Sequence, residues 1–236
     1  MWFERPPGRP DWNLAERHLR RADPALAEVI GRVGQCTLAP RRDYFVVLCQ
    51  AIFTQQISTS IATTLFGRFR DLFPRRRPTP GLVVKLLEDA GAHTNNGQAP
   101  NPVLRACGLS RQKASYLLDL ARHFRDGEIP VRDIPRMSDE EVIDALVTVR
   151  GIGRWTAEMF LIFTLNRPDV LPVDDLGLRE GVRMLDDLLQ RPTAAQVTAR
   201  AEVWRPYRSI ATWYLWRGAS IPAVAERAKN AIVRSR

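Results

Sequence analysis

Two adjacent carboxylates, Asp174 and Asp175, are the residues of this chain best placed to do chemistry. They precede apolar residues at helical spacing, Leu178, Val182 and Leu185, so a helix is predicted to begin at the pair. Helix capping alone would select an aspartate there, because its side chain accepts hydrogen bonds from the first free backbone N–H groups. One carboxylate is enough for capping. The other is open to stabilising a developing positive charge or activating a water molecule.

A glycine-containing turn is the second candidate for chemistry. A helix is predicted to end near Val149, the string Gly151-Ile152-Gly153 makes a tight turn, and a new helix begins around Arg154. The glycines permit positive φ and the close approach of a bulky neighbour. The unpaired N–H groups at the start of the second helix, aided by the helix dipole, form an anion site. A nucleic-acid phosphate fits such a site without any base contact.

An ordinary turn between packed helices is the alternative, and a lone Gly-x-Gly favours that interpretation. The surrounding residues favour DNA binding. Leu146 lies five residues before the turn, and Thr156 and Ala157 follow it, as in the helix-hairpin-helix pattern.

The chain resembles the helix-hairpin-helix/GPD superfamily of base-excision DNA glycosylases, and within it the AlkA-like branch, 3-methyladenine-DNA glycosylase II. The resemblance runs from about residue 23 to residue 218. Four stretches carry it in the family's order: AIFTQQIS (51–58), VRGIGRWTA (149–157), LPVDDLGL (171–178) and WRPYRSIATWYLW (204–216).

The resemblance implies that Asp175 is the catalytic carboxylate. In the family the acid stands after the hairpin, at a helix start, with an apolar residue three positions later. Leu178 satisfies that spacing for Asp175, whereas Gly177 stands at the same spacing from Asp174. We expect Asp175 to act on the oxocarbenium-like sugar that forms when an N-glycosidic bond breaks, and Asp174 to be the N-cap or a support residue.

The residue two positions after the second hairpin glycine decides the reaction type. Family members that also cut the strand use a lysine there to form a Schiff base. This chain has Trp155 at that position, and an indole cannot form an imine. The resemblance therefore implies a monofunctional hydrolase.

A glycosylase must extrude its target nucleotide and hold the base between apolar or aromatic faces. Trp155 and, by resemblance, Trp216 are the expected walls, with Met159 where the AlkA-like branch often has tyrosine. An electron-rich indole face attracts the positive charge of an alkylated purine. Trp204 and Trp213 are expected to pack in the core.

Gln55 and Gln56 follow an apolar run and are predicted to form a helix–helix corner. By resemblance, a side chain here fills the gap left by the flipped nucleotide, and Gln56 stands where AlkA carries leucine. A polar corner, in which a glutamine caps neighbouring backbone, is an equal alternative.

The composition permits a polyanionic partner, since the net charge is +9 and the isoelectric point about 10.3. A GC-rich genome would also raise the arginine content, so the charge is permissive only. The expected partner is double-stranded DNA containing damaged bases. The expected hairpin contacts are Gly151, Ile152, Gly153, Arg154 and Thr156.

The fold is expected to be all-α, because proline, glycine and polar residues divide the chain into amphipathic segments. Examples are 24–33 behind Asp23 and 111–124 behind Ser110. We expect a two-lobed helix-hairpin-helix glycosylase fold with the active site in the cleft between the lobes. Residues 36–168 would form the lobe with the hairpin. Residues 1–35 and 169–236 would form the lobe with Asp175.

No cofactor or metal is expected, with a monovalent cation at the hairpin carbonyls left open. Cys36, Cys49 and Cys107 are odd in number and widely spaced, which suggests neither a disulfide framework nor a metal site. The family's four-cysteine iron–sulfur cluster has no counterpart after Cys107.

No apolar run approaches the roughly 18 residues that cross a bilayer, and the N-terminus lacks a signal-peptide layout. We expect a monomer in a bacterial cytoplasm, associated with the nucleoid through DNA and without a membrane partner. The stretch 91–102, rich in Asn, Gly and Pro, is a predicted surface loop of unassigned role.

The expected function is therefore excision of alkylated, 3-methyladenine-type bases, which initiates base excision repair. One alternative is a non-catalytic helix-hairpin-helix DNA-binding module, in which Asp175 would be dispensable. A second is a glycosylase for other damaged bases, although the missing lysine and cysteines disfavour its commonest versions.

Overall fold

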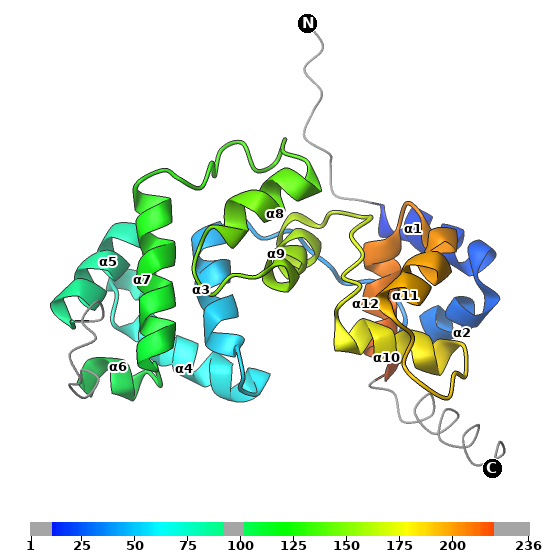
Figure 1. The fold of residues 1–236 in the computed structure, drawn as a ribbon, viewed down its shortest axis with the longest axis horizontal. Helices are drawn as coiled ribbons and strands as arrows, with labels where there is room; N and C mark the ends of the chain where they lie inside the picture. Colours follow the sequence, from blue (N-terminus) through cyan, green and yellow to red (C-terminus); the bar gives the residue numbers. More distant parts are fainter. Residues whose placement is uncertain (1–10, 92–101, 220–236) are drawn as a thin grey trace, which may run out of the picture. The chain divides into compact units, whose positions relative to one another are not determined.

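The computed structural model describes residues 11–91 and 102–219 of the chain. The predicted loop at 91–102 lies almost entirely outside the described residues. Regular structure in the described ranges is helical, with no strand, which confirms the all-α prediction (Figure 1).

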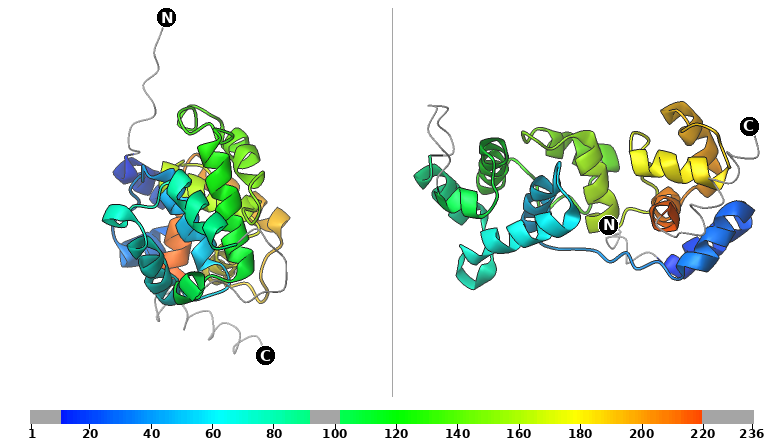
Figure 2. Two further views of the ribbon diagram at one scale, coloured as in Figure 1. Left: turned by 90° about the vertical axis from the view of Figure 1, so that its left-hand side faces the viewer. Right: turned by 90° about the horizontal axis from the view of Figure 1, so that it is seen from below.

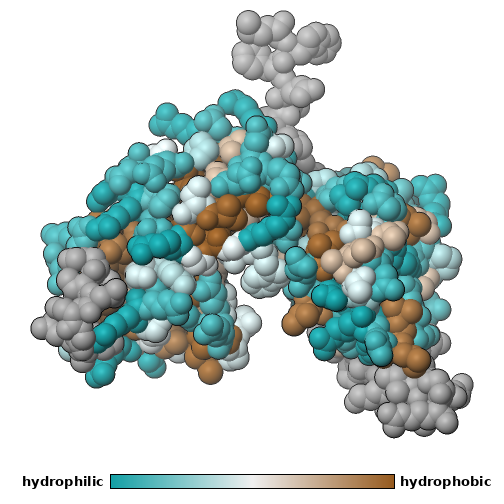
Figure 3. Space-filling view, in the orientation of Figure 1, coloured by the Kyte–Doolittle hydropathy of each residue, from teal (hydrophilic) through white to brown (hydrophobic). Residues whose placement is uncertain are grey.

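The chain divides into two compact units. Unit 1 combines residues 1–40 with 161–236, and unit 2 is the continuous stretch 41–160. The hairpin therefore belongs to unit 2 and Asp175 to unit 1. On the face drawn in Figure 3, most of the surface of each unit is hydrophilic, and each unit also carries smaller apolar patches. The cleft predicted between the lobes stays a prediction.

Unit 2 is built around helix α7, which packs against α3 and α5 (Figures 1 and 2). Ser110 caps α7 and accepts a hydrogen bond from the backbone N–H of Lys113, as the sequence predicts. The helices of this unit are α3 (Tyr44–Thr54), α4 (Thr59–Asp71), η1 (Pro74–Arg76), α5 (Pro80–Asp89), α6 (Pro102–Ala106), α7 (Arg111–Arg125), α8 (Asp139–Val147) and α9 (Arg154–Phe160).

A cluster of aromatic rings fills one part of the core of unit 2. Phe53 from α3 meets Phe66 and Phe69 from α4, and Phe69 also contacts Phe73. Neighbouring ring centroids lie 5.0 to 6.2 Å apart, the range in which tilted and edge-on ring pairs attract one another. The cluster anchors the end of α3, after which the Gln55–Gln56 turn follows.

Unit 1 is built around helix α12, which packs against α2 and α10. Gly181 of α10 lets the two helices approach closely, because a Cβ there would lie 2.7 Å from the Leu215 side chain. The helices of this unit are α1 (Trp12–Ala22), α2 (Pro24–Val33), η2 (Leu161–Leu165), α10 (Leu176–Leu185), α11 (Ala194–Arg200), η3 (Ala201–Trp204) and α12 (Arg208–Ala219).

Asp23 joins the two sequence segments of unit 1. It caps α2 through a hydrogen bond from the Leu26 backbone N–H, and α2 begins at Pro24 as predicted. Its other carboxylate oxygen accepts hydrogen bonds from the Arg200 guanidinium at 2.6 Å and the Trp204 indole at 2.7 Å. Trp204 is fully buried, which confirms the core role predicted for it.

Candidate active site

The carboxylate of Asp175 is the N-cap of α10. Its Oδ1 atom accepts a hydrogen bond of 2.6 Å from the backbone N–H of Leu178. Asp174, which we expected to be the N-cap or a support residue, is exposed and does not cap the helix. The expectation that Asp174 caps the helix was wrong, because the carboxylate that we expected to do chemistry, Asp175, accepts the hydrogen bond at the helix N-terminus. The support role of Asp174 stays a prediction.

The same Oδ1 atom accepts a second hydrogen bond, of 2.7 Å, from the indole N–H of Trp216. Two donors from different parts of the chain thus fix the orientation of the Asp175 side chain: the first turn of α10 and the side of α12. Both Asp175 and Trp216 are half-buried, so the acid lies at the edge of unit 1 and not in its core.

Phe163 stacks on Trp216, with ring centroids 5.4 Å apart and an angle of 17° between the planes. Phe163 is 38% exposed although it lies in an apolar run. A π-helical turn, η2, presents it, and such turns frequently occur at functional sites. Sequence reasoning missed Phe163 because an aromatic inside an apolar run indicates a core position.

Gly177 makes room for this arrangement. A Cβ at position 177 would lie 3.0 Å from Asp175 Oδ1 and 3.0 Å from both Cδ1 and Nε1 of Trp216. Those distances are tighter than ordinary van der Waals contact, so the indole and the carboxylate could not both keep their places. The sequence offered one signal, a glycine in the first turn of an otherwise regular helix, where glycine costs stability.

The hairpin in unit 2 has the predicted form. Helix α8 ends at Val147, α9 begins at Arg154, and the Ile152 backbone N–H donates to the Val149 carbonyl in the turn. Gly151 has a φ of +83°, and a Cβ there would lie 2.2 Å from the Tyr116 ring. Gly151 alone therefore meets both needs that we assigned to the two glycines.

Gly153 differs from Gly151. It is exposed, and a Cβ at position 153 would meet no atom of the described residues within 4 Å. Its carbonyl accepts a hydrogen bond of 3.1 Å from the backbone N–H of Ala157, the first of α9. Thr156 and Ile152 are buried.

Arg154 is held by two carboxylates. Its guanidinium donates to both oxygens of Glu140 at 2.5 and 2.9 Å and to Glu158 at 3.3 Å. The hydrogen bond from Arg154 holds the pKa of Glu140 below its ordinary value. These contacts join α8 to α9, so in this structure Arg154 stabilises the hairpin.

Trp155 and Met159 are one turn apart on α9, which places them on the same face of the helix. Trp155 is 49% exposed and Met159 is half-buried. Both belong to unit 2, whereas Trp216 belongs to unit 1. The joint base pocket predicted from these three residues stays a prediction.

The turn between α3 and α4 presents the predicted wedge. Gln56 is exposed and has a φ of +61°, a left-handed conformation that is uncommon for residues other than glycine. The Gln55 side chain instead points to the hairpin, where its Nε2 donates a hydrogen bond of 2.8 Å to the Gly151 carbonyl. The two glutamines therefore differ in their surroundings: Gln55 joins the turn after α3 to the hairpin, and Gln56 is exposed.

Among residues 11–91 and 102–219, no group of three or more His, Cys, Asp or Glu side chains could hold a metal ion. The described helices include none long and apolar enough to cross a membrane. A monovalent cation at the hairpin carbonyls stays open.

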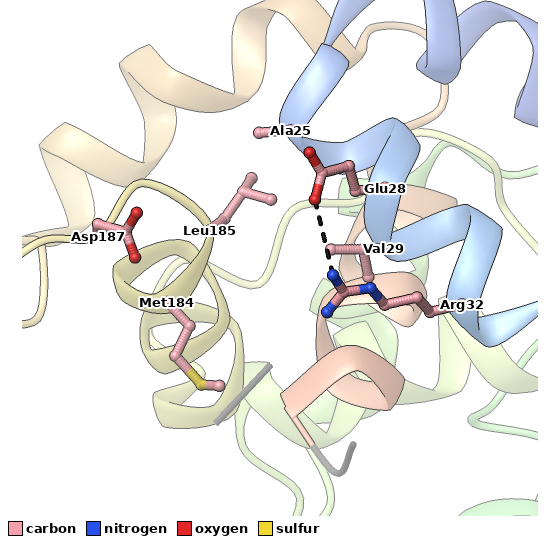
Figure 4. Close-up of a pocket in the computed structure, with 7 residues that line it drawn as sticks. All are labelled: Ala25, Glu28, Val29, Arg32, Met184, Leu185 and Asp187. Atoms are coloured by element: carbon pink, nitrogen blue, oxygen red, sulfur yellow. Dashed lines mark ion pairs between the residues drawn. The ribbon is translucent and has the colours of Figure 1, made fainter. Parts of the chain in front are cut away.

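A cavity of about 200 Å³ lies in unit 1 between α2 and the C-terminal end of α10 (Figure 4). It contains none of the predicted site residues, and an ion pair of 3.8 Å between Glu28 and Arg32 lies on one wall. The lining residues are Ala25, Glu28, Val29, Arg32, Met184, Leu185 and Asp187.

Comparison with known proteins shows which family the chain belongs to. Residues 49–206 match the HhH-GPD superfamily of base excision DNA repair proteins. The matched stretch includes the Gln55–Gln56 turn between α3 and α4 (the wedge turn), the hairpin and Asp175. The chain therefore belongs to the HhH-GPD superfamily.

Individual relatives and a solved structure show the same similarity. DNA-3-methyladenine glycosylase 1 of Schizosaccharomyces pombe is 34% identical over 216 residues, which cover 86% of each chain. The solved structure of 3-methyladenine DNA glycosylase from that yeast, in complex with abasic DNA, has a TM-score of 0.73 and covers 89% of this chain and 98% of its own. DNA-3-methyladenine glycosylase 2 of Escherichia coli is 28% identical, covering 74% of this chain and 57% of its own.

Proposed function

We propose that this chain is a monofunctional DNA glycosylase that releases alkylated bases of the 3-methyladenine type. The observation that carries the proposal is the Asp175 carboxylate, held by the Leu178 backbone N–H and the Trp216 indole N–H beside a partly exposed aromatic stack. An acid fixed next to a flat aromatic surface is what hydrolysis of a base–sugar bond requires.

In the proposed reaction, the bond between C1′ of the deoxyribose and the base nitrogen breaks, and its electron pair leaves with the base. The sugar becomes an oxocarbenium-like cation, whose positive charge the Asp175 carboxylate stabilises. A water oxygen then bonds to C1′ and its proton passes to a carboxylate or to solvent. The products are the free base and an abasic site.

The aromatic surface supports the choice of substrate. Many alkylated purines carry a formal positive charge, and an indole or phenyl face attracts a cation by about 0.5–2 kcal/mol. Phe163 adds a second ring to the one supplied by Trp216, and both lie in the unit that carries Asp175. The stack would favour an alkylated purine over its neutral parent.

The positions of the lysines support hydrolysis without strand cleavage. Trp155 occupies the hairpin position at which a Schiff-base lysine would stand. The two lysines within the described ranges are Lys85, which is exposed on α5, and Lys113, whose ammonium is bonded to two backbone carbonyls. Neither lysine lies in the hairpin, where the Schiff-base lysine of the family would stand.

DNA binding is proposed through the hairpin and the net positive charge. The exposed backbone at Gly153 and the first N–H groups of α9 would hold a phosphate, while Gln56 would fill the gap left by the flipped nucleotide. The solved yeast relative bound to abasic DNA supports this partner. We propose that the protein binds damaged duplex as a monomer.

The test is base release from methylated duplex DNA by the wild type, Asp175→Asn and Asp174→Asn. Asp175→Asn should lose about 100-fold or more of the single-turnover rate while its affinity for DNA stays near that of the wild type. Asp174→Asn is the matched control, because it removes an exposed carboxylate one residue away. Equal release by the wild type and Asp175→Asn would refute the assignment of the acid.

Two alternatives make different predictions in the same assay. A non-catalytic DNA-binding module would bind the duplex and release no base from either protein. A glycosylase for other damaged bases would release, for example, an oxidised base faster than a methylated one, and the same dependence on Asp175 would hold. Incubating the product with and without alkali then shows whether the enzyme itself cuts the abasic strand.

A further inference from the structure

Three residues on helix α7 contact the two loops that the proposed function assigns to DNA. Lys113, Tyr116 and Asp119 are spaced by three, so neighbouring members lie close on one side of the helix. Lys113 reaches the turn after α3, and Tyr116 and Asp119 reach the hairpin.

The Lys113 ammonium donates two hydrogen bonds of 2.8 Å, to the carbonyls of Phe53 and Gln55. These carbonyls belong to the C-terminal end of α3, where the last carbonyls of a helix lack partners within it. A positive charge at this end of a helix also interacts favourably with its dipole. The Lys113 side chain, which comes from another helix, therefore caps the C-terminal end of α3 and fixes the backbone immediately before Gln56.

Tyr116 and Asp119 hold the hairpin from the same helix. The Tyr116 ring packs against Gly151 so closely that a Cβ there would lie 2.2 Å away. Asp119 accepts hydrogen bonds from the backbone N–H of Arg150 at 2.8 Å and from its guanidinium at 3.1 Å. The hairpin turn is thereby fixed to α7 on both sides of the Arg150–Gly151 peptide.

Gln55 connects the turn after α3 both to α7 and to the hairpin. Its backbone carbonyl accepts from Lys113, and its side-chain amide donates to the Gly151 carbonyl at 2.8 Å. The wedge turn is thus bonded to α7 on one side and to the hairpin on the other. Gln56, with a φ of +61°, is the next residue, and a strained conformation persists only where its surroundings impose it.

We propose that Lys113 is a positioning residue, which holds the Gln55–Gln56 turn at a set place relative to the hairpin so that Gln56 enters the duplex at the nucleotide next to the anchored phosphate. The inference rests on the proposed function, since it needs Gln56 to act as the wedge. Lys113 itself touches neither the base nor the sugar. Its effect is preorganisation: the turn does not have to be ordered again when DNA binds.

The experiment measures the affinity for two duplexes of one sequence, undamaged or carrying a stable abasic-site analogue. The variant is Lys113→Met, which keeps the length of the side chain and removes the three N–H donors. Lys85→Met is the matched control, because Lys85 is exposed on α5 of the same unit. We expect Lys113→Met to lose about 10-fold of the preference for the abasic duplex, with undamaged DNA bound nearly as before, and Lys85→Met to keep that preference.

A double-mutant cycle with Gln56→Ala separates positioning from a general loss of stability. If Lys113 acts through Gln56, the preference for the abasic duplex should fall no further in Lys113→Met/Gln56→Ala than in Gln56→Ala alone. Additive losses, or a loss for both duplexes in proportion to a lower melting temperature, would overturn the proposal. Gln55→Ala, which breaks the other bond of the turn, should reproduce the selective loss if Lys113→Met folds poorly.

The same measurements distinguish a failure of the positioning role of Lys113 from a failure of the proposed glycosylase function. A wild type that releases methylated bases but shows no effect of Gln56→Ala on abasic-site preference would retain the glycosylase and refute the wedge, and Lys113 with it. A wild type that neither releases bases nor prefers the abasic duplex would refute both. A preference that depends on Gln56 but not on Lys113 would refute the positioning role alone.

Discussion

The indole N–H of Trp216 donates a 2.7 Å hydrogen bond to the carboxylate of Asp175. Trp216 comes from the C-terminal half of α12 and Asp175 from the residue before α10, so the packing of these two helices fixes the relationship. The side chain predicted to stack on the base therefore also supplies one of the two hydrogen bonds that orient the acid. A change to the aromatic ring should affect binding and chemistry together.

Trp216→Phe should separate the two roles. The phenyl ring can still stack on Phe163, but the donor to Asp175 is lost, and a hydrogen bond to a charged group contributes about 1.5–3 kcal/mol. We expect the single-turnover rate of base release to fall by about 10- to 100-fold, with a smaller change in affinity for the damaged duplex.

Trp213→Phe is the matched control for that substitution. Trp213 is buried on the same helix and packs edge-on against Tyr214 with ring centroids 4.9 Å apart. The control should lower the melting temperature without a comparable change in the rate measured well below it. A rate loss of the same size in both variants would argue against a special role for the Trp216–Asp175 bond.

Gly177→Ala tests the space around the acid. The added methyl group would lie 3.0 Å from both the carboxylate oxygen and the indole nitrogen, so the hydrogen bond between them should lengthen or break. We expect a lower rate of base release in a protein that still folds. Gly81→Ala is the control: this helical glycine has no atom of the described chain within 4 Å of an added Cβ, and the change should raise stability by about 0.5–1 kcal/mol.

Local patterns allowed the elements to be predicted, whereas the choice of Asp175 as the acid rests on the family resemblance and stays a prediction. The cap at Ser110, the start of α2 at Pro24 and the hairpin turn all follow from short-range rules, and each is present. The N-cap was assigned to the wrong aspartate because two adjacent carboxylates satisfy the same local rule. The structure distinguishes Asp175 by its cap on α10 and by the hydrogen bond from Trp216, 41 residues away.

The sequence did not reveal the roles of Phe163 and Lys113, because these roles depend on backbone geometry and on contacts with residues far away in the chain. Phe163 is exposed because a π-helical turn displaces it from the regular periodicity, and nothing in an apolar run announces such a turn. Lys113 contacts carbonyls 58 and 60 residues away in the chain. A surface lysine and a lysine that caps a distant helix have the same local sequence pattern.

The buried carboxylate of Asp23 should make stability depend on pH in the acid range. Burial is the largest single influence and acts to raise the pKa of Asp23, but hydrogen bonds from Trp204, the Leu26 backbone and Arg200 together outweigh it and lower that pKa. A lowered pKa in the folded state means that the stabilisation is complete above the unfolded value, about 3.9. It is lost as the pH falls through the folded pKa.

Asp23→Asn should therefore destabilise the protein by about 1.5–3 kcal/mol at neutral pH, because the hydrogen bonds from Arg200 and Trp204 lose a charged acceptor. Arg200 keeps its ion pair with Asp186. The stability of the variant should also vary less than that of the wild type between about pH 4 and 2. Thermal or denaturant unfolding across that range measures both effects. Parallel pH profiles for the two proteins would show that Asp23 is not the group that titrates.

The two hairpin glycines provide the sharpest test of DNA binding, because they differ in what surrounds them. Gly151→Ala must displace the Tyr116 ring and adopt a φ of +83°, so it should lower both stability and DNA affinity. Gly153→Ala meets no atom of the described residues, so its melting temperature should stay within a few degrees of the wild type. If a phosphate approaches the backbone at Gly153, however, the methyl group will obstruct it and weaken binding to undamaged duplex by about 10-fold. Unchanged affinity in Gly153→Ala would mean that DNA does not approach the hairpin at this residue.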